Sequence, residues 1–205
     1  MKYLNNKEFM KTALLSVALL VISLIINFYA GVYATEKASN PVTDIILSNI
    51  RVYDVDGIFV YGPFFLWAFV VCILIAEPRR IPFTLKSIAL FVLIRSVFIS
   101  LTHLGPFPTH VIIPSTNFIS YFTSGQDLFF SAHTGLPFLL ALIFWDKIYL
   151  RVFFIISSLI FGAVVLLTHL HYSIDVLSAF FITYTIYHIA EKLFKKDRET
   201  FVSGI

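Results

Sequence analysis

Long apolar runs separated by short polar segments account for most of the chain. Six of these runs come near the ~20 residues that a helix needs to cross a bilayer. They cover residues 12–33, 58–76, 85–101, 128–145, 149–167 and 172–189. Pro137 breaks the fourth run, and Gly62 with Pro63 interrupts the start of the second. The pattern predicts an all-α integral membrane protein, a bundle of six transmembrane helices.

The composition agrees with a membrane protein. Of the 205 residues, 59% are hydrophobic and 13% are charged, whereas soluble domains carry roughly 25% charged residues. This length leaves no room for a sizeable soluble domain. We therefore expect a single membrane-embedded domain over residues 1–205, with a motif-bearing core at about residues 85–190. The single cysteine, Cys72, lies inside an apolar run, so no intrachain disulfide is expected.

Basic residues are distributed unevenly between the two sides of the predicted bundle. Six spans place both termini on one side, and the loops of the opposite side hold only Lys37 and Arg51. The side of the termini carries twelve basic residues: Lys2, Lys7, Lys11, Arg79, Arg80, Lys86, Lys147, Arg151, Lys192, Lys195, Lys196 and Arg198. Because short cytoplasmic loops are enriched in Lys and Arg, both termini should be cytoplasmic. We expect a multi-pass protein of a plasma (inner) membrane.

Three ionisable residues lie at similar depths inside apolar runs. Arg95 is six residues from the outer end of its run, about 9 Å deep at about 1.5 Å per residue. His133 lies about five residues below the same surface, and Asp175 about one turn below it. Because such residues mark functional sites in membrane proteins, we expect one shared site that faces the non-cytoplasmic side. The alternative for Arg95 is a side chain that extends up to the interface.

Another polar segment, residues 169–176, separates the last two runs. If Tyr172 begins a helix, His171 and Asp175 are four residues apart and share a face. The carboxylate can then accept from one imidazole nitrogen and leave the other as a nucleophile or base. The alternative is a polar cap on a membrane helix, with Asp175 in its first turn. His169 is either a secondary phosphate contact or a cap of the turn.

An arginine, two histidines and an aspartate at a membrane surface suit phosphoryl transfer. Arginine binds phosphate oxygens in a bidentate way. One histidine can attack phosphorus while the other protonates the leaving oxygen. The sequence contains no Gly-rich phosphate loop and no paired-carboxylate magnesium motif, which argues against a nucleotide substrate. We expect no cofactor and no nucleic-acid partner.

Two segments resemble the catalytic motifs of a known family. Residues 131–134 (Ser-Ala-His-Thr) and 171–176 (His-Tyr-Ser-Ile-Asp-Val) are similar to motifs of the sphingomyelin synthases, a branch of the type-2 phosphatidic acid phosphatase superfamily. Asp127 matches the first position of that branch's Asp-x-x-x-Ser-Gly-His-Thr motif. Arg95 and the segment that follows it resemble the branch's arginine, Thr-Thr-Leu-Pro and Pro-x-x-His elements. The resemblance spans roughly residues 95–181.

The resemblance implies roles for the motif residues. His171 would be the nucleophile that forms a phosphohistidine, Asp175 its orienting partner and His133 the general acid. We assign the phosphate contacts to four residues, Arg95, Ser131, Asp127 and His169, and expect no metal. The expected partners are membrane lipids. A phospholipid or lipid phosphate would be the donor and ceramide or diacylglycerol a possible acceptor; the oligomeric state stays open.

Departures from the superfamily's phosphatases favour the synthase branch. Those phosphatases have an arginine six residues before the nucleophilic histidine, where this chain has Val165, and their Lys-x6-Arg-Pro motif is missing. Ala132 replaces the usual glycine of the first motif. We therefore expect transfer of a phospho-head group between lipids. The alternative is a lipid phosphate phosphatase that hydrolyses monoesters of the phosphatidic acid type.

Two other classes of function compete with these enzymes. His133, His169, His171 and Asp175 could form a zinc site with imidazole and carboxylate ligands. A small transporter could use Arg95 and the histidines as a polar pathway. The sequence has no paired repeat halves, which argues against a transporter.

Overall fold

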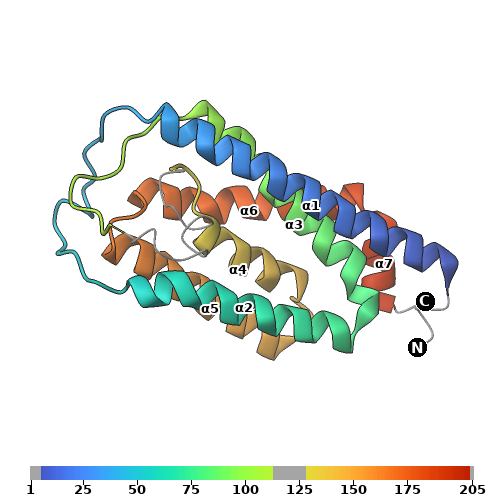
Figure 1. Cartoon of the computed structure of the whole chain (residues 1–205). Helices are drawn as coiled ribbons and strands as arrows, with labels where there is room; N and C mark the ends of the chain where they lie inside the picture. Colours follow the sequence, from blue (N-terminus) through green and yellow to red (C-terminus); the bar gives the residue numbers. More distant parts are fainter. Residues whose placement is uncertain (1–5, 113–127, 204–205) are drawn as a thin grey trace.

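The structure, a computed structural model, describes residues 6–112 and 128–203 (Figure 1). Its described part is helical and contains no strand, which confirms the all-α prediction. The helices are α1 (Lys7–Glu36), α2 (Asp56–Ala76), the 3-10 helix η1 (Pro78–Arg80), α3 (Ile81–Leu101), α4 (Ala132–Ile143), α5 (Ile148–Leu167), α6 (Ser173–Leu193) and α7 (Lys195–Ser203).

Five segments of the described part are long and apolar enough to cross a membrane. They are α1, α2, η1 with α3, α5 and α6. The predicted fourth span differs, because α4 has only 12 residues and a rise of about 18 Å against a hydrocarbon core of about 30 Å. Its helix begins late because Phe129 and Phe130 have φ values of 96° and 67°, outside the right-handed helical region. Six full crossings and the cytoplasmic side of the termini stay predictions.

The helices form a bundle in which two outer pairs enclose α4 (Figure 1). Helix α1 packs along α3 and α2 packs on α5, while α4 packs on α5 and α6. The start of α1, η1 and α7 lie at one end of the bundle. The loops 37–55 and 102–112 lie at the other end, beside the turn between α5 and α6. The polar segments that suggested a site therefore come together at one end.

Helix α1 contacts the bundle through a narrow stripe. Its buried residues are Phe9, Ser16, Ser23 and Ala34, which recur on one helical face. Small residues of this kind let two membrane helices approach closely. Large apolar side chains such as Leu14, Ile22 and Tyr29 are exposed on the rest of α1, as expected for a helix that faces lipid.

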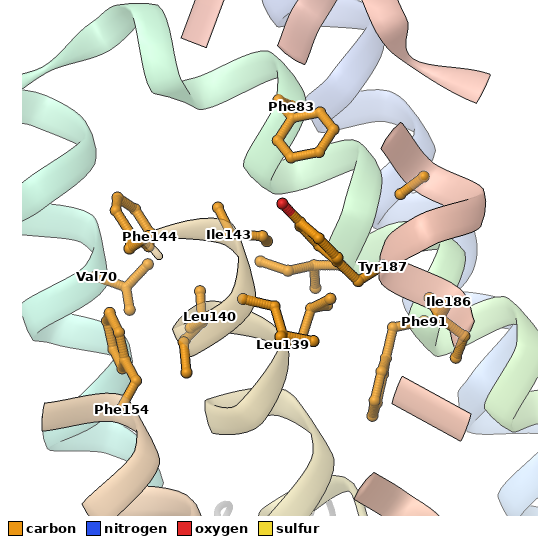
Figure 2. Close-up of a cluster of buried hydrophobic side chains, with 14 of the residues drawn as sticks. Val70, Phe83, Phe91, Leu139, Leu140, Ile143, Phe144, Phe154, Ile186 and Tyr187 are labelled. Atoms are coloured by element: carbon orange, nitrogen blue, oxygen red, sulfur yellow. The ribbon is translucent and has the colours of Figure 1, made fainter. Parts of the chain in front are cut away.

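The hydrophobic core surrounds α4 (Figure 2). Leu139, Leu140 and Ile143 are fully buried and point toward side chains of the neighbouring helices. Those neighbours include Val70, Phe91, Phe154, Ile186 and Tyr187. Close contact of α4 with its neighbours depends on Gly135. A Cβ there would lie 2.8 Å from the Phe91 ring and 2.9 Å from the Thr183 hydroxyl.

The C-terminal segment packs against the bundle, which the sequence did not predict. Helix α7 closes the end of the bundle through an ion pair of 2.6 Å between Lys86 Nζ and Asp197 Oδ2. The guanidinium of Arg80, a residue 1% exposed, lies over the rings of Phe144 and Phe201, at 5.2 and 4.8 Å from their centroids. Some of the basic residues on the side of the termini therefore have partners within the protein.

Candidate functional site

The second motif forms the start of α6. Tyr172 is the N-cap, with φ −71° and ψ 156°, and the helix begins at Ser173. This boundary places His171 beside Asp175, with 3.2 Å between Nδ1 and Oδ2. Asp175 Oδ2 also accepts the backbone N–H of Tyr172 at 3.0 Å. The side chains of His171 and Asp175 are 4% and 0% exposed, so the pair lies in a largely water-excluded place.

This pairing determines which nitrogen of His171 can react. A proton on Nδ1 is directed at Asp175, so the lone pair of the neutral imidazole lies on Nε2. The carboxylate also favours the imidazolium charge that develops when Nε2 bonds to an electrophile. Asp175 Oδ1 is buried and accepts no hydrogen bond in the described part. An imidazole held in this way can act as a nucleophile or as a base.

The first motif is held against α6 through its backbone. Residues 128–131 are not helical, and such backbone is tolerated at membrane depth only where protein satisfies its polar groups. The Ser131 N–H donates to the Asp175 carbonyl at 3.2 Å. The Phe130 carbonyl accepts from Arg95 Nε, also at 3.2 Å. The two motifs, 44 residues apart at Ser131 and Asp175, are therefore linked directly.

Arg95 is buried in the bundle and braces this segment. Its side chain is 4% exposed, so the alternative in which it extends to the interface is wrong. Besides the Phe130 carbonyl, its guanidinium contacts Asn27 on α1, where Nη1 donates to Oδ1 at 3.2 Å. Near the end of α3, Thr102 Oγ1 donates to the Leu128 carbonyl at 3.2 Å. Sequence reasoning gave Asn27 no role, although an amide inside an apolar helix is a signal of a polar partner.

His133 occupies the first turn of α4, and its half-buried ring packs against two aromatic side chains. It stacks on Phe59 of α2, with 4.1 Å between ring centroids and an interplanar angle of 20°. Phe161 of α5 meets it edge-on at 6.3 Å. These contacts fix the orientation of the His133 imidazole. The hydrogen bond from the Ser131 N–H to the Asp175 carbonyl keeps this turn next to the start of α6.

His169 is a constrained residue of the α5–α6 turn. It has φ 54°, a left-handed conformation that His adopts more readily than most residues. Its Nδ1 lies 2.7 Å from the Thr109 hydroxyl, and its buried Nε2 has no partner in the described part. Burial lowers the pKa of His169, and the nearby Asp44 charge only partly opposes this shift. His169 therefore contributes hydrogen bonding to the site without a fixed positive charge.

Two predicted phosphate contacts remain, Ser131 and Asp127, and the structure describes only the first of them. Ser131 is fully buried, and its Oγ has no hydrogen-bond partner in the described part. Asp127 lies outside the described residues, so its place in the site stays a prediction.

Buried polar atoms without partners concentrate at the two motifs. The described part has seven such side-chain atoms, and four of them belong to Ser131, Thr134, His169 and Asp175. A buried group without a hydrogen bond costs about 1–3 kcal/mol, so folded proteins keep few of them. Their concentration in the first motif and in the segment from His169 to Asp175 is typical of a place that receives a polar ligand.

Two loops cover the start of α6. Tyr172 Oη donates to the Gly105 carbonyl at 2.8 Å and accepts the Val42 N–H at 3.2 Å. The loops also bond to each other, because the Ser39 N–H donates to the His103 carbonyl at 2.8 Å. A Cβ at Gly105 would collide with the Ser39 backbone, so only glycine fits this crossing.

Asp44 is a site-adjacent residue that sequence reasoning missed. Its Oδ1 accepts the N–H groups of Ile46 and Leu47 at 2.8 and 3.0 Å. Its Oδ2 accepts the N–H of Ser173, the first residue of α6, at 2.7 Å. Burial raises the pKa of Asp44, but these hydrogen bonds outweigh it and the net pKa is lowered. Nothing in the local sequence around Asp44 indicates the bond to α6, because its partner lies 129 residues away.

The geometry gives the zinc alternative no support. Within residues 6–112 and 128–203, no group of three or more His, Cys, Asp or Glu side chains is arranged to hold a metal ion. The His171 nitrogen nearest to Asp175 is used by that carboxylate.

Comparison with known proteins adds one finding. A family model described as "PAP2 superfamily C-terminal" matches residues 125–192, which contain both motifs, helices α4 and α5, and all but the last residue of α6. No curated protein and no solved structure matches the chain. The match supports the type-2 phosphatidic acid phosphatase superfamily, and with it a multi-pass membrane enzyme that acts on phosphate esters.

Proposed function

We propose that this protein is an integral-membrane lipid phosphotransferase of the sphingomyelin synthase-like kind. It would move a phospho-head group from one lipid to another through a phosphohistidine on His171. The observation that carries the proposal is the buried pair of His171 and Asp175, with 3.2 Å between Nδ1 and Oδ2. The superfamily match supports a lipid phosphatase or phosphotransferase in general.

In the first half-reaction, Nε2 of His171 attacks phosphorus. The bond from phosphorus to the oxygen of the donor lipid breaks, and His133 protonates that oxygen so that it leaves as an alcohol. Asp175 balances the positive charge of the phosphorylated imidazole ring. In the second half-reaction, His133 takes the proton of an acceptor hydroxyl, whose oxygen attacks phosphorus and releases Nε2.

The phosphate would be bound by groups on both sides of His171. The Ser131 hydroxyl and Nε2 of His169 are buried polar groups without a partner in the described part, and both can donate to phosphate oxygens. Arg95 adds a positive charge behind the first motif, although two of its nitrogens contact Asn27 and the Phe130 carbonyl. A contribution of Asp127 follows from the family resemblance alone.

Limited positive charge and limited water favour transfer over hydrolysis. Val165, where the superfamily's phosphatases have arginine, is fully buried against Phe59, Val164 and Leu170. With His169 neutral, the site suits the single charge of a phosphodiester better than the two charges of a monoester. The low exposure of His171 disfavours water as the acceptor.

The deciding experiment measures two reactions of the purified protein. The first offers a phospholipid diester with ceramide or diacylglycerol; the second offers phosphatidic acid without an acceptor. We expect head-group transfer to be faster than phosphate release, and His171→Ala to show neither reaction. Rapid phosphate release without transfer to either acceptor would make the protein a lipid phosphate phosphatase.

A further inference from the structure

We propose that Asp44, in the loop between α1 and α2, is a positioning residue for the reaction. Its carboxylate occupies the N-terminus of α6 and holds the turn that carries His171 and Asp175. The proposal rests on the proposed function only for the role of that pair.

The bond between Asp44 and α6 uses a donor that the helix cannot satisfy itself. The first N–H groups of a helix have no intrahelical acceptor, and the N–H of Ser173 is such a group. It donates to Asp44 Oδ2 at 2.7 Å, a length typical of a bond to an ionised acceptor. The other oxygen of Asp44 is held by two N–H groups of its own loop. Asp44 therefore joins two segments that are 129 residues apart.

The Asp44 carboxylate is itself the anion that is bound at the N-terminus of α6. A helix N-terminus attracts anions through its free N–H groups and its dipole. Asp44 already fills this place, and the hydrogen bonds that lower its pKa keep it ionised at neutral pH. A substrate phosphate is thereby directed away from Ser173, toward Nε2 of His171 and the first motif.

Asp44 acts on the reacting nitrogen through the backbone of one turn. Ser173 is two residues from His171 and two from Asp175. Between them, the Tyr172 N–H donates to the same Asp175 oxygen that faces His171. A shift of Ser173 would move this arrangement and turn the imidazole. Because Asp44 is not placed to touch the substrate, its loss should lower kcat more than it changes KM.

Two substitutions remove the bond from opposite ends. Asp44→Asn keeps the size of the side chain, but in either amide orientation a donor N–H₂ faces the N–H groups of one segment. Ser173→Pro removes the N–H donor. Proline is favoured at the first helical position, and the φ and ψ of Tyr172 lie in the region allowed before proline. The matched controls are Asp54→Asn, an exposed acid of the same loop, and Ser173→Ala, which removes the hydroxyl and its hydrogen bond to Asp44 but keeps the N–H that donates to Asp44 Oδ2.

We expect Asp44→Asn and Ser173→Pro each to lower kcat by about 10- to 100-fold, the loss of one charge-assisted hydrogen bond. KM should change little, and the double variant should be no worse than the more damaged single variant. Asp54→Asn should match the wild type, and Ser173→Ala should lose less than Ser173→Pro. Multiplicative effects of the two substitutions, or wild-type turnover in Asp44→Asn, would overturn the proposal.

A second measurement does not depend on turnover. Amide hydrogen exchange over residues 171–176 should be faster in Asp44→Asn than in Asp54→Asn. If His171→Ala keeps full activity, the proposed function fails while the exchange result still decides the role of Asp44. If Asp44→Asn does not yield folded protein, Ser173→Pro against Ser173→Ala decides it by the same kcat comparison. Equal exchange and equal turnover in both pairs would refute the positioning role.

Discussion

At the scale of residues, the chemistry proposed for His171 depends on Asp175. Its Oδ2 serves both His171 and the Tyr172 N–H. Asparagine can supply one oxygen for the N–H of Tyr172, but it cannot supply a charge to an imidazolium. The carboxylate should therefore matter far more for turnover than for folding.

We predict that Asp175→Asn folds normally but loses activity by orders of magnitude, about 10⁴-fold in a comparable triad. Steady-state kinetics, with size-exclusion chromatography of the same sample, would test both parts. His171→Ala should abolish any acid-labile, alkali-stable phospho-adduct formed during turnover. An adduct that persists in His171→Ala would show that another residue is the nucleophile.

The lowered pKa of His169 predicts that the stability of the protein depends on pH. Its folded pKa is lowered from 6.5, so below about pH 6.5 the unfolded chain binds more protons than the folded one. Stability should therefore fall as the pH decreases through the range around the unfolded value of about 6.5. His169→Asn, which tolerates the left-handed φ, should show a smaller fall in Tm over this range. An unchanged pH dependence in that variant would mean that His169 does not titrate as its burial implies.

At the scale of elements, α4 is the helix on which the site depends. It is a short, central helix with closely packed side chains, and the first motif lies at its start. The nearest atoms to a Cβ at Gly135 come from α3 and α6. Any added volume must therefore push α4 away from the helices that hold Arg95 and Asp175.

Gly135→Ala should accordingly lower both thermal stability and activity. The expected destabilisation is about 1–3 kcal/mol, as for overpacking of a closely packed core. Gly31→Ala in α1 is the matched control, because a Cβ there meets nothing within 4 Å. A thermal-shift assay of the two variants checks this prediction. Equal Tm values for both would show that α4 can move without cost.

At the scale of the whole molecule, the two ends of the bundle differ in chemistry. One end carries the loops and both motifs; the other carries η1, α7 and most of the basic residues (Figure 1). From the positive-inside rule we predict that the basic end lies in the cytoplasm. The site would then face the opposite side and take its lipids from that leaflet.

Cysteine labelling in intact cells tests this orientation. In a Cys72→Ser background, a membrane-impermeant reagent should label a cysteine placed by Thr109→Cys but not one placed by Lys147→Cys. Both positions are exposed in the structure, so a difference in labelling reports sidedness. The reverse pattern would place the site on the cytoplasmic side.

The sequence alone determined most of the helices and one local part of the candidate site, the pair of His171 and Asp175. A run of about 20 apolar residues must satisfy its own backbone in a membrane, so five of the six predicted spans appear as long helices. The pairing of His171 with Asp175 was equally readable, because a spacing of four places two side chains on one face of a helix turn.

Only the tertiary structure decided the contacts that join distant segments. Asn27 lies 68 residues from Arg95, and Asp44 lies 129 residues from Ser173. The late start of α4 also depends on such contacts, because Arg95 satisfies the Phe130 carbonyl in its non-helical backbone. Local spacing leaves no trace of these partners, since a hydrogen bond between remote segments forms only once the packed helices have brought its two groups together.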